Sequence, residues 1–101
     1  MVLTNKCSLN IGAIPKGNTF KDVIEITNKS DRQLMLAPWV GCSCTEAYLD
    51  KGILEQDQTV KLNVKYTPTH TGLDEKQFGV VYKPNETTEC KLIITIIAKV
   101  I

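Results

Sequence analysis

Long apolar runs, linker-like segments and an excess of charge of one sign are all missing from this chain of 101 residues. With 12 Lys and Arg against 11 Asp and Glu, the formal net charge is +1, whereas a nucleic-acid-binding module needs a concentrated basic patch. The longest apolar stretch is interrupted by Thr95 and Lys99 and is shorter than the ~20 residues that span a bilayer. We therefore expect no nucleic-acid partner and no membrane insertion.

Signals for export and for catalysis are missing as well. The N-terminus shows no basic region followed by an apolar stretch and a small-residue cleavage site, so no signal peptide is expected and the cysteines are expected to be reduced. The sequence has no nucleophile with a nearby base and no phosphate-binding loop, and His70 lies among threonines. We expect no enzyme activity and no cofactor.

What the sequence does contain is apolar residues at every second position, a pattern typical of strands with one buried face. Val60 to Tyr66 alternates without a fault, and every even position from Cys90 to Val100 is apolar. The turn residues Asn28 to Asp31 favour a reversal of the chain. We expect strands at residues 7–11, 20–27, 33–37, 39–49, 60–66, 78–82 and 90–100.

About seven short strands without a helical period predict an all-β fold. We expect a single immunoglobulin-like β-sandwich, antiparallel and with Greek-key connections, over residues 1–101. A domain of this length buries roughly two-thirds of the surface that its unfolded chain exposes, so it needs no disulfide or metal to fold.

The most distinctive stretch runs from Pro38 to Thr45 and holds the only tryptophan and two of the four cysteines. Pro38 has no amide hydrogen for a strand ladder, which indicates an edge, a bulge or a strand that changes sheets. Trp39 is expected in the core, because sandwiches often fill the space between sheets with a large aromatic residue, and Thr45 is expected there as part of the same motif. In an extended strand, Cys42 and Cys44 would lie about 6.5 to 7 Å apart, so we expect them not to bond to each other.

The cysteines allow three interpretations. We expect buried thiols, because free cysteine behaves as a small hydrophobic residue. The four cysteines and His70 could instead bind zinc, but Cys7 and Cys90 are isolated, unlike the closely paired ligands of common zinc modules. A disulfide between Cys7 and Cys90 stays open in an oxidising compartment.

The odd positions of the last strand form the candidate protein interface. Ile93, Thr95, Ile97 and Lys99 share one face, with the two isoleucines about 13 Å apart on an extended strand. An exposed apolar stripe of this kind is usually covered. A partner subunit could cover it or pair with the strand edge, or another part of the same chain could bury it.

The order of elements around Cys42-Ser43-Cys44-Thr45 resembles a bacterial family of immunoglobulin-like domains of unknown function, related to major sperm protein and ASH-type domains. The family has a Cys-Gly-Cys-Thr block, a Pro-Gly turn, an alternating strand, a glycine-containing loop and a closing strand. The corresponding segments here are Cys42 to Thr45, Leu54 to Gln58, Val60 to Tyr66, Gly72 with Phe78, and Leu92 to Val100. Ser43 replaces the glycine of the block, and Glu55-Gln56-Asp57 replaces the Pro-Gly turn.

This resemblance implies a non-catalytic structural or interaction module in a protein assembly. Small immunoglobulin-like proteins serve as accessory or decoration subunits of bacteriophage capsids, which implies a partner such as the major capsid protein or another virion subunit. The expected location is then the virion or the cytoplasm of the producing cell. The alternative is a carbohydrate-binding or adhesion domain of an exported bacterial protein, which would need several exposed aromatic rings side by side.

Overall fold

The computed structural model describes residues 2–85 and 87–101 and contains only strands and turns there. The strands are β1 (Val2–Thr4), β2 (Ser8–Ile14), β3 (Phe20–Asn28), β4 (Leu34–Val40), β5 (Thr45–Leu49), β6 (Ile53–Leu54), β7 (Thr59–Tyr66), β8 (Gly72–Tyr82) and β9 (Cys90–Val100). No helix long and apolar enough to cross a membrane occurs in these residues.

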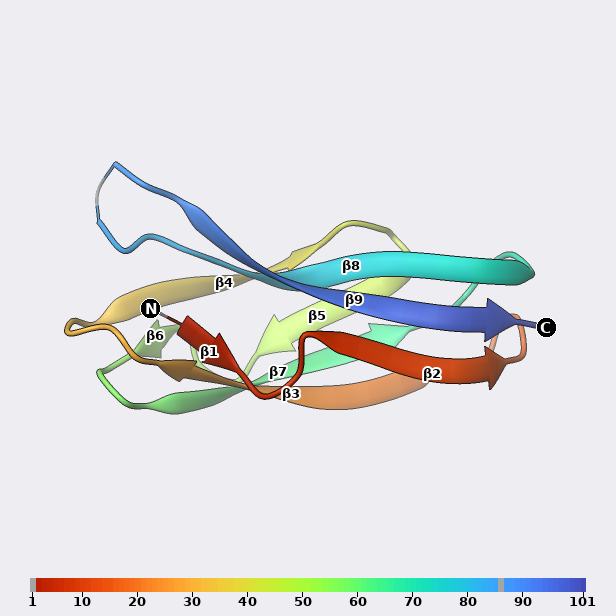
Figure 1. The fold of residues 1–101 in the computed structure, drawn as a ribbon, viewed down its shortest axis with the longest axis horizontal. Coiled ribbons are helices and arrows are strands. Elements are labelled where there is room, and N and C mark those ends of the chain that lie inside the picture. Colours follow the sequence, from red (N-terminus) through yellow and green to blue (C-terminus); the bar gives the residue numbers. More distant parts are fainter. Residues whose placement is uncertain (1, 86) are drawn as a thin grey trace.

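The strands form two sheets that pack face to face (Figure 1). The four-stranded sheet has the order β1-β3-β7-β5 and the five-stranded sheet the order β2-β9-β8-β4-β6. The predicted immunoglobulin-like sandwich is confirmed. Two short strands, β1 and β6, were not expected, and β2 pairs with β9 in parallel rather than antiparallel fashion.

The core lies between the two sheets and follows the predicted alternation. Ile24 and Leu62 from the four-stranded sheet and Phe78 and Ile94 from the five-stranded sheet have no exposed surface. Burying a side chain of this size stabilises the fold by about 1.5 to 3 kcal/mol. The alternation therefore fixes which face of each long strand turns inward.

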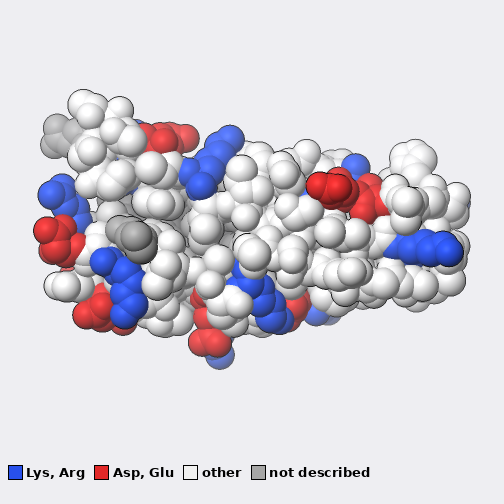
Figure 2. Space-filling model, viewed as in Figure 1, with Lys and Arg blue, Asp and Glu red and all other residues white. Residues whose placement is uncertain are grey.

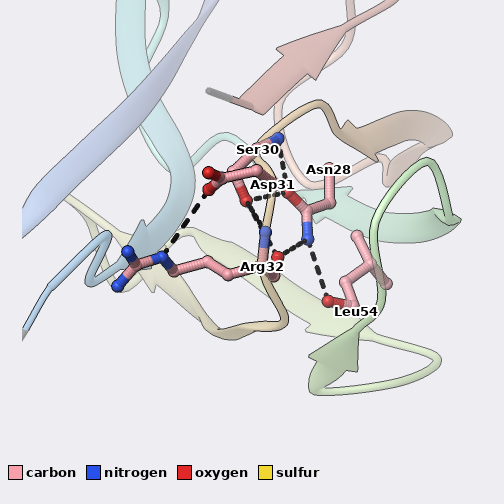
Figure 3. A network of polar contacts seen from close by, with 5 residues as sticks. All are labelled: Asn28, Ser30, Asp31, Arg32 and Leu54. Atoms are coloured by element: carbon pink, nitrogen blue, oxygen red, sulfur yellow. Dashed lines mark hydrogen bonds and ion pairs between the residues drawn. The ribbon is translucent and has the colours of Figure 1, made fainter.

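A buried asparagine holds the turn after β3 (Figure 3). The side chain of Asn28 is fully buried, and its Nδ2 donates to the carbonyl oxygens of Arg32 and Leu54 at 2.9 Å each. Its Oδ1 accepts from the backbone N–H and the Oγ of Ser30 at 2.9 and 2.7 Å. The predicted turn is present, and one side chain ties it to β6.

A polar bridge joins the two sheets at the other end of β7. Buried Tyr66 donates its hydroxyl to the carboxylate of Asp74 on β8, and Lys76 lies 3.4 Å from that carboxylate. Burial, with the hydrogen bond to Asp74 and its charge, raises the pKa of Tyr66. Burial alone would raise the pKa of Asp74, but the hydrogen bonds from Tyr66 and Lys76 and the lysine charge lower it. The pair is therefore a neutral phenol on an ionised carboxylate at neutral pH.

Candidate functional site

The odd residues of β9 point out of the sandwich, away from the core. Ile93 is 43% exposed and Ile97 is 41% exposed, with Lys91 and Lys99 exposed and Thr95 half-buried beside them. Among the described residues, no second layer covers this face. Of the two alternatives left by the sequence, burial of the stripe within the same chain does not occur.

Trp39 extends this stripe across the five-stranded sheet. The register places Trp39 opposite Gly79 on β8 and Gly79 opposite Ile93 on β9. Trp39 is half-buried on this outer face, and the Nζ of Lys91 lies 4.6 Å from its ring centroid. A lysine over an indole face is an attractive cation–π arrangement.

The prediction that Trp39 lies in the core is therefore wrong. Leu34 and Leu36 occupy the inward positions of β4 and are buried, so strand alternation turns odd-numbered Trp39 to the opposite face. The parity with the two leucines was visible in the sequence. Thr45, in contrast, is buried as expected.

We define the apolar face by six apolar side chains that share this side of the five-stranded sheet. Its members are Met35, Ala37, Trp39, Val81, Ile93 and Ile97. Figure 2 shows this side of the molecule, where uncharged residues cover much of the area over β8 and β9. Such a surface is suited to docking another apolar surface.

At one end the apolar face continues into a groove of about 960 Å³ between β4 and the β8–β9 connection. Met35, Val81 and Tyr82 contribute to its wall, and Arg32 and Glu89 supply charge around it. Burial, followed by the neighbouring Cys90 thiol, raises the pKa of Tyr82. Its hydroxyl thus stays protonated at neutral pH.

The last strand keeps a free edge along its first part. β8 pairs with β9 from Cys90 to Val100, but β2 pairs only from Thr95 onward, so pairing of a partner with this edge stays a prediction. Of the three positions predicted for Pro38, the structure shows a local edge, because β6 pairs with β4 only at Leu34 and Met35 and leaves that side of Pro38 without a strand among the described residues. The outer edge of β3 is occupied by the side chain of Asn5, whose Oδ1 accepts from Glu25 N at 2.9 Å. At these two places a proline and a polar side chain hinder strand addition.

The motif cysteines do not lie on one extended strand, as was expected. Residues 41–44 form a turn that carries the chain from β4 in one sheet to β5 in the other. This turn brings the Cα atoms of Cys42 and Cys44 to 5.3 Å, and their sulfurs form a disulfide. The prediction that the two would not bond is wrong because it assumed strand geometry.

The other two cysteines are free. Cys7 is exposed and Cys90 only partly buried, so the expectation of buried thiols is wrong for Cys7, and the disulfide between these two is not formed. The carbonyl of Cys7 accepts from Thr95 N at 3.2 Å, in the middle of β9, whereas Cys90 begins that strand. The parallel pairing of β2 with β9 separates them.

No metal-binding cluster forms among the described residues. Within 2–85 and 87–101, no three His, Cys, Asp or Glu side chains gather in a way that could hold an ion. His70 is exposed, and its Nδ1 lies 3.0 Å from the Oγ1 of Thr69. Since Cys42 and Cys44 are bonded to each other, they are not available as a pair of zinc ligands.

Comparisons with known proteins agree with this architecture. A family described as "Protein of unknown function (DUF1573)" matches residues 2–99, while no curated protein matches the sequence. An ASH/PapD-like domain of human CEP192 superposes with a TM-score of 0.75 and 16% identity, over 99% of this chain and 84% of that one.

Two further folds are similar. The Caenorhabditis elegans MSP family member WR4 has a TM-score of 0.68 at 16% identity, over 97% of each chain. The Escherichia coli chaperone DraB has a TM-score of 0.67 at 9% identity, over 98% of this chain and 55% of the chaperone. Identities this low establish the shared fold alone.

Proposed function

The chain belongs to the DUF1573 family of unknown function, and from that premise we propose that it is a non-catalytic interaction module that docks a protein partner through the apolar face. The observation that carries this proposal is a cross-strand row on the outer face of one sheet, from half-buried Trp39 on β4 over Gly79 on β8 to exposed Ile93 on β9. Ile97 is exposed on the same face, farther along β9. Aromatic and branched apolar side chains of this kind form the energetic centres of protein interfaces.

A protein is a better-supported partner than a carbohydrate. A sugar-binding platform needs adjacent exposed rings, but Trp39 lies on the five-stranded sheet and Tyr48 on the four-stranded sheet. Tyr66 and Phe78 are buried in the core. One similar fold is a chaperone, which is consistent with a partner that is itself a protein.

The particular assembly that we propose is a bacteriophage virion, with the major capsid protein or another virion subunit as the partner. The support for this choice is that small immunoglobulin-like proteins serve as accessory subunits of bacteriophage capsids. In such an assembly the domain would be found in the virion or in the cytoplasm of the producing cell.

Photo-crosslinking in the producing cell tests the proposal. A photoreactive amino acid replaces Ile97 in one variant and Val23 in another, because Val23 is 39% exposed on the outer face of the four-stranded sheet. We expect Ile97 to crosslink to one defined protein, which is lost when Ile93→Lys is added, and Val23 to give no such product.

Each outcome has a clear meaning. Equal crosslinking from both faces, or none from Ile97, would contradict docking through the apolar face. A capsid subunit crosslinked at Ile97 would support the proposed virion assembly. A cellular protein crosslinked there would contradict the virion assembly but not docking through the apolar face. Binding to a glycan array that requires Trp39 would favour the carbohydrate alternative.

A further inference from the structure

A second site lies on the opposite sheet, where the Cys42–Cys44 disulfide borders a cleft. We propose that this disulfide is a reversible redox site, which exchanges with thiols of a protein or a small molecule that enter this cleft and attack Cys44. The proposal is independent of docking through the apolar face.

The fold around the bond does not depend on it. The two cysteines are separated by one residue, and a disulfide that closes so short a loop removes little chain entropy from the unfolded state. Backbone hydrogen bonds hold the turn from both sides, since Gly41 N donates to the Gln77 carbonyl and Thr67 N to the Cys44 carbonyl, each at 2.9 Å. We therefore expect the turn to keep its shape when the bond opens.

The surroundings of the two sulfurs distinguish them. The backbone N–H of Cys44 donates to the Sγ of Cys42 at 3.2 Å. Hydrogen bonds to sulfur favour its charged form, so this amide is placed to stabilise a Cys42 thiolate. The hydroxyl of Thr45 lies 3.6 Å from the Sγ of Cys44 and can do the same for that sulfur.

The cleft next to the disulfide has a volume of about 500 Å³ and gives access to one side of the pair. Its lining includes Ser43 and Cys44, and it includes Lys21, Lys65 and Glu46 from neighbouring strands. Two lysines against one glutamate leave this part of the cleft positive, which attracts an incoming thiolate. Reactive cysteines lie in partly exposed, electropositive surroundings of this kind.

These contacts assign the roles of the sulfurs. Cys44 lines the cleft and Cys42 does not, so the incoming thiolate forms a new S–S bond with the Sγ of Cys44. The bond between Cys42 and Cys44 breaks, and its electron pair leaves on the Sγ of Cys42 as a thiolate held by the Cys44 amide. A mixed disulfide between Cys44 and the partner results.

A second partner thiolate completes the exchange. It attacks the partner's sulfur in the mixed disulfide and releases Cys44 as a thiolate, and the protons of the two partner thiols pass to Cys42 and Cys44 through solvent. In sum, two partner thiols are oxidised to a disulfide, and the cysteine pair is reduced by two electrons. Reversal of the same steps would return the pair to its oxidised form.

Glutathione serves as the probe in a Cys7→Ser, Cys90→Ser background, because both of those cysteines are free. The protein is equilibrated with buffers of varied reduced-to-oxidised ratio, quenched with acid, alkylated and weighed by mass spectrometry. We expect the pair to change between oxidised and reduced forms within the range of these buffers, while circular dichroism shows the same fold for both.

The rate of reduction by glutathione tests the role of the cleft. We expect Lys21→Gln with Lys65→Gln to slow reduction by glutathione at least about threefold, and Lys61→Gln, elsewhere on the same sheet, to leave the rate unchanged. Three results would overturn the proposal: a pair that stays oxidised at every ratio, a pair that oxidised glutathione cannot oxidise, or a double lysine variant that is reduced at the original rate. Because circular dichroism is recorded for every variant, misfolding is recognised separately.

Discussion

The outer faces of the two sheets differ in composition, although both sheets bury the same kind of apolar residue inward. On the four-stranded sheet, Lys21 lies opposite Lys65 and Lys65 opposite Glu46, and Thr27 and Thr59 share a hydrogen bond of 2.8 Å between their hydroxyls. On the five-stranded sheet, the corresponding cross-strand row is Trp39, Gly79 and Ile93.

This difference shows which features of the outer faces are needed for folding and which are not. A polar outer face is the expected solvated side of an antiparallel sheet. The exposed Val23 and Tyr48 on this face are separated by the polar Asn63 between them, and single exposed apolar residues need no special explanation. A connected apolar row with a tryptophan in it is not required for folding. Its presence on only one of the two faces is therefore a signal of interaction.

The largest expected effect concerns the glycine in the middle of the apolar face. A Cβ at Gly79 would overlap the backbone carbonyl of Leu92, whereas a Cβ at Gly52 would lie 3.6 Å from the Leu36 carbonyl, an ordinary contact. We expect Gly79→Ala to lower the free energy of unfolding by about 3 kcal/mol or more, because backbone must move to make room. Urea unfolding of both variants measures this, and equal stability of Gly79→Ala and Gly52→Ala would contradict the close approach of β8 and β9.

Removing the hydrogen bond between Tyr66 and Asp74, which joins the two sheets, should have the next largest effect on stability. Tyr66→Phe removes the hydroxyl that donates to Asp74, and we expect it to lower the free energy of unfolding by about 1 to 3 kcal/mol at pH 7. A Thr27→Val control, which removes a hydroxyl from the solvated face, should cost less.

The same bridge predicts a dependence on pH. Because the folded pKa of Asp74 is lowered, its contribution is complete above the unfolded value of about 3.9 and is lost as pH falls through the folded pKa. Because the folded pKa of Tyr66 is raised, its contribution is complete below about 10 and is lost at higher pH. Urea unfolding across the acid and alkaline ranges should show a weaker dependence in Tyr66→Phe, and an unchanged dependence would argue against the bridge.

Replacing a lysine on each of the two faces should give a smaller difference in stability and fluorescence. Lys91 lies over the ring of Trp39, and Lys61 is exposed on the opposite sheet. We expect Lys91→Ala to reduce stability by about 0.5 kcal/mol and to alter the fluorescence of this only tryptophan. Lys61→Ala should leave the emission spectrum unchanged, and a shift of equal size in both variants would show that the lysine over the ring has no special role.

Sequence alternation predicted the sandwich because each long strand carries an uninterrupted pattern. It could not predict β1 and β6, which are too short to show a period, or the parallel partner of β9, which depends on how the N-terminal segment divides between the sheets. The candidate stripe at Ile93 and Ile97 was visible in the sequence, but its extension to Trp39 required the register between β4, β8 and β9. The Cys42–Cys44 bond was missed because periodicity describes strands and not the turn that joins them.

The affinity of the partner captured at Ile97 tests the central claim most directly. Ile97→Lys and Val23→Lys place the same charge on the two faces, at residues that are 41% and 39% exposed. Docking through the apolar face predicts that Ile97→Lys raises the Kd at least about tenfold, a loss of about 1.4 kcal/mol, while Val23→Lys leaves the Kd within about twofold. Equal Kd values for the two variants, or a larger rise for Val23→Lys, would contradict the claim.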